Sequence, residues 1–113
     1  MLNLNLLVLR CADLEASKRF YELVGMRFSR HAHGAGPEHY AHEDARGVFE
    51  LYPAKPGEQD RIGLGFTINE FTAARDRFAE ASFAPGPVVQ NEWGTSFLVR
   101  DPDGRRVEIK QSS

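Results

Sequence analysis

Two glutamates near the ends of the two halves of the chain are the residues best suited to chemistry. Glu50 lies in the strand-like stretch 48–52 and Glu108 in the stretch 107–110, each among apolar neighbours. A carboxylate in a cavity can act as a general base, accept hydrogen bonds from a ligand, or bind a cation. The alternative is that each glutamate occupies the solvated face of an alternating strand. We predict Glu50 and Glu108 as the catalytic residues.

Arg10 is the best candidate for holding an anionic group of a ligand. It ends the apolar stretch 2–11 and lies four residues after Leu6, so both side chains share one face of a strand. A guanidinium group binds a carboxylate through two parallel hydrogen bonds. The alternative is a structural ion pair with Glu50 or Glu108.

Three more side chains are predicted to bind the ligand. Tyr52 shares a face with Glu50, because side chains alternate along a strand. His39 is a candidate acid or base near Glu50, although alternation leaves open whether His39 or His42 faces inward. Thr67 shares a face of its strand with two glycines that leave room for a ligand, or for close strand packing.

The elements that carry these residues are predicted to form one βαβββ unit written twice. Two pairs of matching residues, 14 with 71 and 21 with 78, are each 57 positions apart. Asp13 caps a first helix that Gly25 ends, and a second helix starts at residue 69 or 70. We expect a single domain over 1–113, with modules at about 1–54 and 60–113. Its strands are expected at 2–11, 26–33, 38–43, 47–52, 61–68, 88–89, 95–100 and 105–111.

The amino-acid composition restricts the classes of protein to which the chain can belong. A chain of 113 residues with 42% hydrophobic and 27% charged residues is typical of one globular domain. Its formal net charge of −2 predicts neither a nucleic acid nor an anionic membrane as a partner. The single cysteine, Cys11, excludes an intrachain disulfide, and no apolar run reaches ~18 residues. With no basic leader at the N-terminus, we predict a cytoplasmic protein.

Several short motifs follow one another in an informative order. They are Leu9-Arg10 with Asp13-Leu14, Ser17 and Phe20-Tyr21, then Gly25-Met26, Phe49-Glu50-Leu51, Asp101-Pro102-Asp103-Gly104 and Glu108. In this order and spacing the chain resembles the vicinal oxygen chelate superfamily, which includes glyoxalase I, extradiol dioxygenases, and fosfomycin and bleomycin resistance proteins. The resemblance covers nearly the whole chain and implies an α+β fold, in which two βαβββ modules form a curled mixed sheet around a cavity.

The resemblance also implies where a metal would be held. Metal-dependent members take their ligands from the first and last strands of each module, which correspond here to Leu6, Glu50, Gly63 and Glu108. Leucine and glycine replace the expected histidines, and their side chains have no donor atom. We therefore expect no cofactor; the alternative is a divalent metal bound weakly by Glu50 and Glu108.

Three functions follow from these expectations. The first is small-molecule binding or metal-free turnover, as in the bleomycin resistance type. The second is a metal-dependent lyase or isomerase of the glyoxalase class that uses Glu50 and Glu108. The third is a regulatory domain with a filled cavity, so the sequence leaves open whether the chain is an enzyme. In each case the resemblance implies a homodimer.

Overall fold

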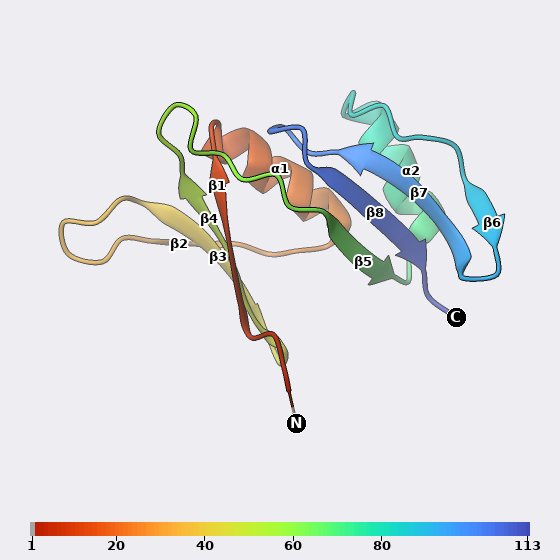
Figure 1. The fold of residues 1–113 in the computed structure, drawn as a ribbon, viewed down its shortest axis with the longest axis horizontal. Coiled ribbons are helices and arrows are strands. Elements are labelled where there is room, and N and C mark those ends of the chain that lie inside the picture. The colour runs from red at the N-terminus through yellow and green to blue at the C-terminus, as the bar shows by residue number, and fades with distance from the viewer. Residues whose placement is uncertain (1) are drawn as a thin grey trace.

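The computed structural model describes residues 2–113 as two similar α+β modules that lie side by side (Figure 1). Each module is a four-stranded mixed sheet, with strand orders β1-β4-β3-β2 and β5-β8-β7-β6, and neither sheet closes into a barrel. The first module contains β1 (Leu6–Cys11), α1 (Leu14–Val24), β2 (Ser29–His31), β3 (His39–Asp44) and β4 (Gly47–Pro53). The second contains β5 (Leu64–Ile68), α2 (Phe71–Glu80), β6 (Val89–Asn91), β7 (Gly94–Arg100) and β8 (Arg106–Gln111).

The predicted βαβββ order is confirmed, while several strands are shorter than expected. Residues 2–5 do not form part of β1, although Val48 N–H donates to the carbonyl of Asn5 at 2.8 Å. The expected strand 26–33 is reduced to β2, because the chain then enters a turn in which Gly36 N–H donates to the carbonyl of His33. The two first strands, β1 and β5, are edge strands that pair in parallel with β4 and β8.

Helix α1 begins and ends at the residues that the sequence indicates. The Asp13 side chain accepts a hydrogen bond from Ala16 N–H at 3.0 Å, which satisfies a donor that the first turn cannot pair. Gly25 has a φ of 125°, a conformation that residues with a side chain adopt at a cost. Helix α2 has no such side-chain cap at Glu70. No helix within residues 2–113 has both the length and the apolar character needed to cross a membrane.

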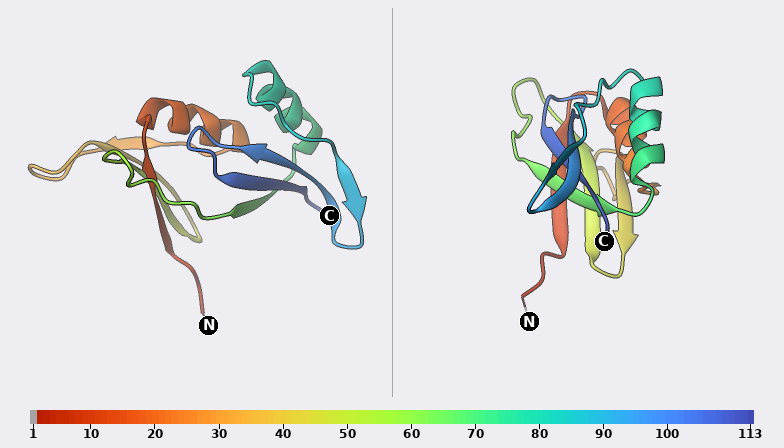
Figure 2. Two further views of the ribbon diagram at one scale, coloured as in Figure 1. Left: turned by 45° about the horizontal axis from the view of Figure 1, so that its top comes forward. Right: turned by 90° about the vertical axis from the view of Figure 1, so that its right-hand side faces the viewer.

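An aromatic core joins the two modules on the helical side of the sheets. Figure 2 shows both helices on the same side of the molecule. The Phe20 ring of α1 lies 5.0 Å from that of Phe78 on α2, and the Tyr21 ring lies 5.1 Å from that of Phe49 on β4. Each fully buried aromatic side chain contributes about 1.5–3 kcal/mol by leaving water. Burial of these rings therefore fixes both helices against one another and against the sheets.

A buried arginine forms the polar connection between the modules. Arg105 is only 2% exposed, and its guanidinium lies 2.6 Å from Asp60, 2.8 Å from Asp101 and 3.4 Å from Asp103. It also donates to the backbone carbonyl of Arg10 at 2.5 Å. Although burial opposes a charge on either group, these contacts raise the pKa of Arg105 and lower that of Asp60. The network therefore connects the linker, the β7–β8 turn and the free edge of β1.

The same network reaches helix α1 and the turn after β1. The Tyr21 hydroxyl donates to the Asp101 carboxylate at 2.7 Å, and Ala12 N–H donates to Asp103 at 3.1 Å. Burial and the neighbouring Asp101 charge raise the pKa of Tyr21, so it remains a neutral donor. These carboxylates thus hold β1, the turn after it and helix α1 against the β7–β8 turn.

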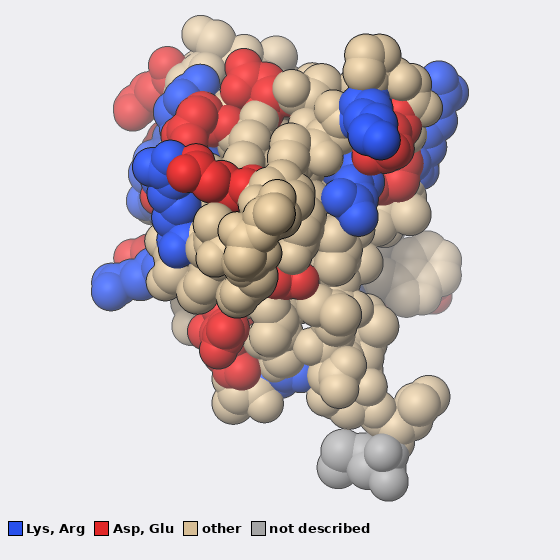
Figure 3. Space-filling model, turned by 90° about the vertical axis from the view of Figure 1, so that its left-hand side faces the viewer, with Lys and Arg blue, Asp and Glu red and all other residues tan. Residues whose placement is uncertain are grey.

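Charged side chains on the surface are mixed in sign. At the end of the molecule where β2 turns into β3, basic and acidic groups flank an uncharged central ridge (Figure 3). One surface pair in this hairpin joins Arg30 to Glu38. Such exposed pairs contribute little to stability, in contrast to the buried Arg105 network.

We predict that Arg105→Met lowers the free energy of unfolding by about 3–5 kcal/mol, because three buried or half-buried carboxylates lose their counter-charge. The adjacent exposed residue provides the control: Arg106→Met should change stability by no more than about 0.5 kcal/mol. Adding Asp60→Asn to Arg105→Met should recover part of the loss. Urea unfolding measures all three, and an Arg105→Met protein as stable as Arg106→Met would contradict the assigned role.

Candidate ligand-binding site

Four side chains form a row across the first sheet, on the face turned away from the helices. Arg10 of β1 is opposite Tyr52 of β4, and His39 of β3 is opposite His31 of β2. The β3–β4 register aligns Tyr40 with Leu51, which places His39 beside Tyr52. This sheet register answers the question that the sequence left open, because His39 and not His42 shares the face of Glu50.

The rings in this row are stacked on one another. The Tyr52 and His39 rings are nearly parallel, with centroids 4.1 Å apart and planes at 9°. The Arg10 guanidinium lies 5.0 Å from the Tyr52 ring centroid, and His31 and His33 lie 5.7 Å and 5.2 Å from His39. Cross-strand pairs of this kind, and cations over aromatic rings, each contribute up to about 1 kcal/mol. The stack therefore holds Tyr52 and His39 in fixed orientations.

The hydrogen bonds of His39 determine which of its nitrogens can exchange a proton. His39 is 2% exposed, and its Nδ1 lies 3.3 Å from the carbonyl of Pro37, which can only accept. A neutral His39 therefore carries its proton on Nδ1. Its Nε2 lies 3.3 Å from the Tyr52 hydroxyl and 3.5 Å from a carboxylate oxygen of Glu50. This nitrogen can take up a proton, and Glu50 would then stabilise the charged ring.

Arg10 has a fixed backbone and a free guanidinium. Its N–H donates to Asp60 at 3.1 Å and its carbonyl accepts from Arg105. Within residues 2–113 its guanidinium makes no ion pair, and neither Glu50 nor Glu108 lies within ion-pair distance of it. Glu50 instead lies 3.5 Å from His39, and the buried arginine of the fold is Arg105, whose partners are aspartates. The Arg10 guanidinium remains available to an anionic ligand.

The structure does not bring all predicted site residues together. Glu108 and Thr67 belong to the second sheet, where Glu108 is aligned with Gly65 and Thr67 with Lys110. Glu108 lines a cavity of about 380 Å³ with Leu98 and Arg106, while Thr67 lines a different cavity between the modules. Within one chain the candidate site therefore consists of Arg10, Tyr52, His39 and Glu50.

The side chains present do not fit a metal centre of the kind that the resemblance implies. On β1 the residue aligned with Glu50 is Val8, and on β5 the residue aligned with Glu108 is Gly65. Neither these residues nor Leu6 and Gly63 carries a donor atom, whereas zinc and nickel sites need about three or four protein ligands. Within residues 2–113 no three His, Cys, Asp or Glu side chains are placed to hold a metal.

Sequence reasoning missed the residues that support the site from behind. Arg105 and Asp60 fix the backbone of Arg10 but lie 45 residues apart. The only local signal for either was the turn sequence 101–104, which the structure confirms as a turn in which Gly104 N–H donates to the Asp101 carbonyl. The stacking of His31 and His33 on His39 depends on the register of β2, and the sequence did not specify that register.

Comparison with known proteins identifies the family. The Glyoxalase/Bleomycin resistance protein/Dioxygenase superfamily matches residues 3–109, and the chain belongs to this family. The predicted vicinal oxygen chelate resemblance is therefore confirmed. No curated protein sequence matches the chain.

Solved structures with the same fold have varied roles. TnmS3, an antibiotic binding protein from Streptomyces sp. CB03234, superposes with a TM-score of 0.80 at 23% identity, covering 100% of this chain and 98% of its own. Oxidase ChaP-H2 gives 0.80 at 20% identity, covering 99% and 94%. Lactoylglutathione lyase from Agrobacterium tumefaciens gives 0.66 at 18% identity, covering 96% and 92%. At these identities the comparisons define the fold alone, and the function has to be argued from the residues of the candidate site.

Proposed function

We propose that this protein binds a small organic molecule that carries an anionic group, and that it does so without a metal ion. The observation that carries the proposal is the stacked row of Arg10, Tyr52 and His39 beside Glu50. The free guanidinium binds the anionic group of the ligand, and the fixed rings present a surface for a planar or apolar part. The antibiotic-binding role of TnmS3, which has the same fold, supports this class of function.

The same residues support metal-free turnover as a second function. The Tyr52 hydroxyl donates to His39 Nε2 while His39 is neutral. When Nε2 accepts a proton, Glu50 stabilises the resulting charge, and the Tyr52 hydroxyl is then free to donate to the ligand. Proton abstraction next to a carbonyl group requires only such a base and a donor. This assignment replaces a pair of catalytic carboxylates by a histidine supported by one carboxylate, since Glu108 lies on the other sheet.

The site is proposed to be completed by a second copy of the chain. The chain exposes 7478 Å² of accessible surface, whereas a compact protein of 12.7 kDa exposes about 6,200 Å². The excess of about 1,200 Å² resembles the area that one partner buries in a stable dimer. Apolar side chains are exposed on both modules, among them Leu2, Leu4, Leu6, Val88, Val89, Trp93 and Leu98. With its single cysteine buried and unpaired, we propose a cytoplasmic homodimer.

A thermal-shift screen of carboxylate-bearing metabolites and antibiotics tests the binding function, because a ligand that binds only the native state raises its melting temperature. Compounds that stabilise the wild-type protein should also stabilise Arg19→Ala, an exposed arginine on α1, and should fail to stabilise Arg10→Ala. In urea, Arg10→Ala should lose no more than about 1 kcal/mol, because its guanidinium has no ionic partner. Ligands that stabilise Arg10→Ala as strongly as the wild type would remove Arg10 from the site.

Sedimentation velocity tests the dimer. We expect the protein to sediment as a dimer at micromolar concentration, and Leu98→Glu to shift it toward monomer, because an unpaired carboxylate would be buried in the interface. Arg19→Glu places the same new charge on the helical side and should leave the dimer intact. A wild-type protein that stays monomeric over the whole micromolar range would contradict the proposed assembly.

A further inference from the structure

A cleft between the two modules is separate from the row on the first sheet. It combines a cavity of about 540 Å³ with an adjoining one of about 890 Å³. Neither is lined by Arg10, His39, Glu50 or Tyr52. We call this the inter-module cleft, defined by the residues that line both cavities: Val24, Gly25, Arg46, Gly65, Phe66, Thr67 and Ile68.

Apolar side chains line most of the smaller cavity of the inter-module cleft, while polar side chains gather along the larger one. Edge strands β1 and β5 point in different directions (Figure 1), and residues of both strands line the smaller cavity. Additional apolar residues line its smaller cavity, namely Leu4, Leu6, Leu7, Met26, Val48, Phe49 and Leu64. Small-molecule sites typically enclose about 300–1,000 Å³ with mostly apolar walls and a few polar groups. Each cavity taken singly has a volume in this range, and the smaller one has such a lining.

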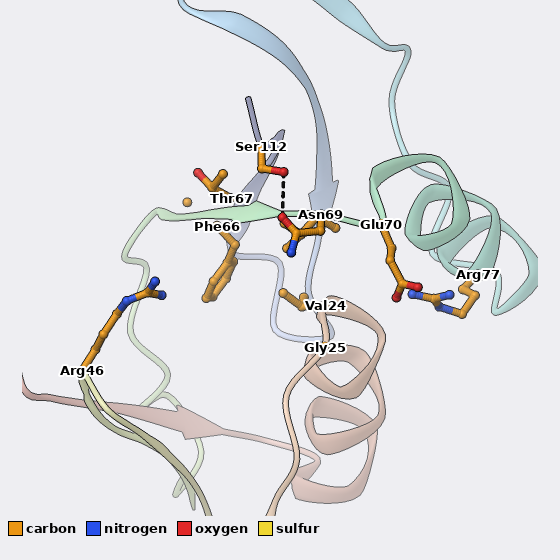
Figure 4. Close-up of a pocket in the computed structure, with 11 residues that line it drawn as sticks. Val24, Gly25, Arg46, Phe66, Thr67, Asn69, Glu70, Arg77 and Ser112 are labelled. Atoms are coloured by element: carbon orange, nitrogen blue, oxygen red, sulfur yellow. Dashed lines mark hydrogen bonds between the residues drawn. The ribbon is translucent and has the colours of Figure 1, made fainter.

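Two arginines line the cleft, Arg46 and Arg77, and Arg46 is the one that faces the apolar wall. Arg46 extends toward Phe66 and Thr67 from the opposite side of the cleft (Figure 4). Its backbone N–H donates to Asp44 and its carbonyl accepts from Asn3, but its guanidinium makes no hydrogen bond or ion pair within residues 2–113. A guanidinium beside an apolar wall is a binding group for a carboxylate or sulfonate.

The other polar groups at the cleft favour an anion over a cation. Among residues 2–113 the Thr67 hydroxyl has no hydrogen-bond partner, and the amide oxygen of Asn69 accepts from Ser112 at 2.8 Å, which leaves its NH₂ group to donate. Asp44 lies 3.4 Å from His42 Nε2 and accepts from the backbone of Arg46. Glu70 points toward Arg77, on the far side of the cleft from Arg46 (Figure 4).

We propose that the inter-module cleft binds an amphiphilic monoanion, with its apolar body between Phe66 and the β1 side and its anionic head on Arg46. This site lies outside the row of Arg10, Tyr52 and His39, and a molecule bound there contacts both modules. In this site the Thr67 hydroxyl would donate a hydrogen bond to the bound anion. A dimer that buried Leu4 and Leu6, which line the smaller cavity, by apolar contacts alone would leave the Arg46 guanidinium without a counter-charge, whereas an anionic head supplies one.

Calorimetric titration with 2-naphthoate and its uncharged amide, 2-naphthamide, tests this proposal. The two probes match in size and differ in charge, so the wild-type protein should bind the carboxylate about two- to fivefold more tightly. Arg46→Gln should remove that difference while Arg19→Gln retains it. Gly65→Leu should abolish binding of both probes, since a Cβ there has no neighbour closer than 4.0 Å and its side chain would fill the cleft.

Because 2-naphthoate also suits the row of Arg10, Tyr52 and His39, the cleft is measured in an Arg10→Gln background, in which binding and the preference for the carboxylate should both persist. The proposal is overturned if the wild-type protein binds neither probe or both equally, or if Gly65→Leu retains binding. It is also overturned if Arg10→Gln abolishes binding, which would place the probe on the first sheet. An affinity that falls as sedimentation shows the dimer forming would assign the cleft to a second copy.

Discussion

The buried guanidinium of Arg105 is the interaction on which the arrangement of the two modules depends. An arginine that is 2% exposed must be neutralised, because an uncompensated buried charge costs several kcal/mol. Here the compensation comes from Asp60 in the linker and from Asp101 and Asp103 in the β7–β8 turn. Each of these groups would be destabilising alone. Together they fix the position of the β7–β8 turn of the second module relative to strand β1 of the first.

The same network positions the candidate site. Both backbone polar groups of Arg10 are bound, its N–H by Asp60 and its carbonyl by Arg105, although Arg10 lies on an edge strand. A strand edge held in this way fixes the point from which the side chain starts, and the Arg10 guanidinium lies over the Tyr52 ring, 5.0 Å from its centroid. The stability of the fold and the geometry of the binding row are therefore linked. A substitution at Arg105 is therefore expected to displace Arg10, although the Arg105 side chain itself does not contact the ligand.

Local features of the fold could be predicted from the sequence. The Asp13 cap, the Gly25 stop and the 57-residue repeat each rest on interactions within a few residues or on a simple pattern, and the structure confirms them. Alternation along β4 also placed Glu50 and Tyr52 on one face. A single sequence carries these signals because local geometry determines them.

Contacts between distant strands could not be predicted in the same way. Alternation on β3 allowed either His39 or His42 to face Glu50, and only the β3–β4 register decides between them. An arginine at the start of a strand is typical of an exposed position, so nothing near Arg105 indicated its burial. The separation of Glu108 from Glu50 depends on how the modules sit side by side. That arrangement comes from the aromatic core and the Arg105 network rather than from any local pattern.

The central claim is that Glu50 supports His39 and does not ligate a metal. Elemental analysis of the protein purified from cells, without added chelator or metal, tests it most directly. We expect far less than one equivalent of zinc, nickel, iron or manganese per chain, with no difference between the wild type, Glu50→Gln and Glu108→Gln. Close to one metal ion per site in the wild-type protein, lost in either variant, would contradict the account.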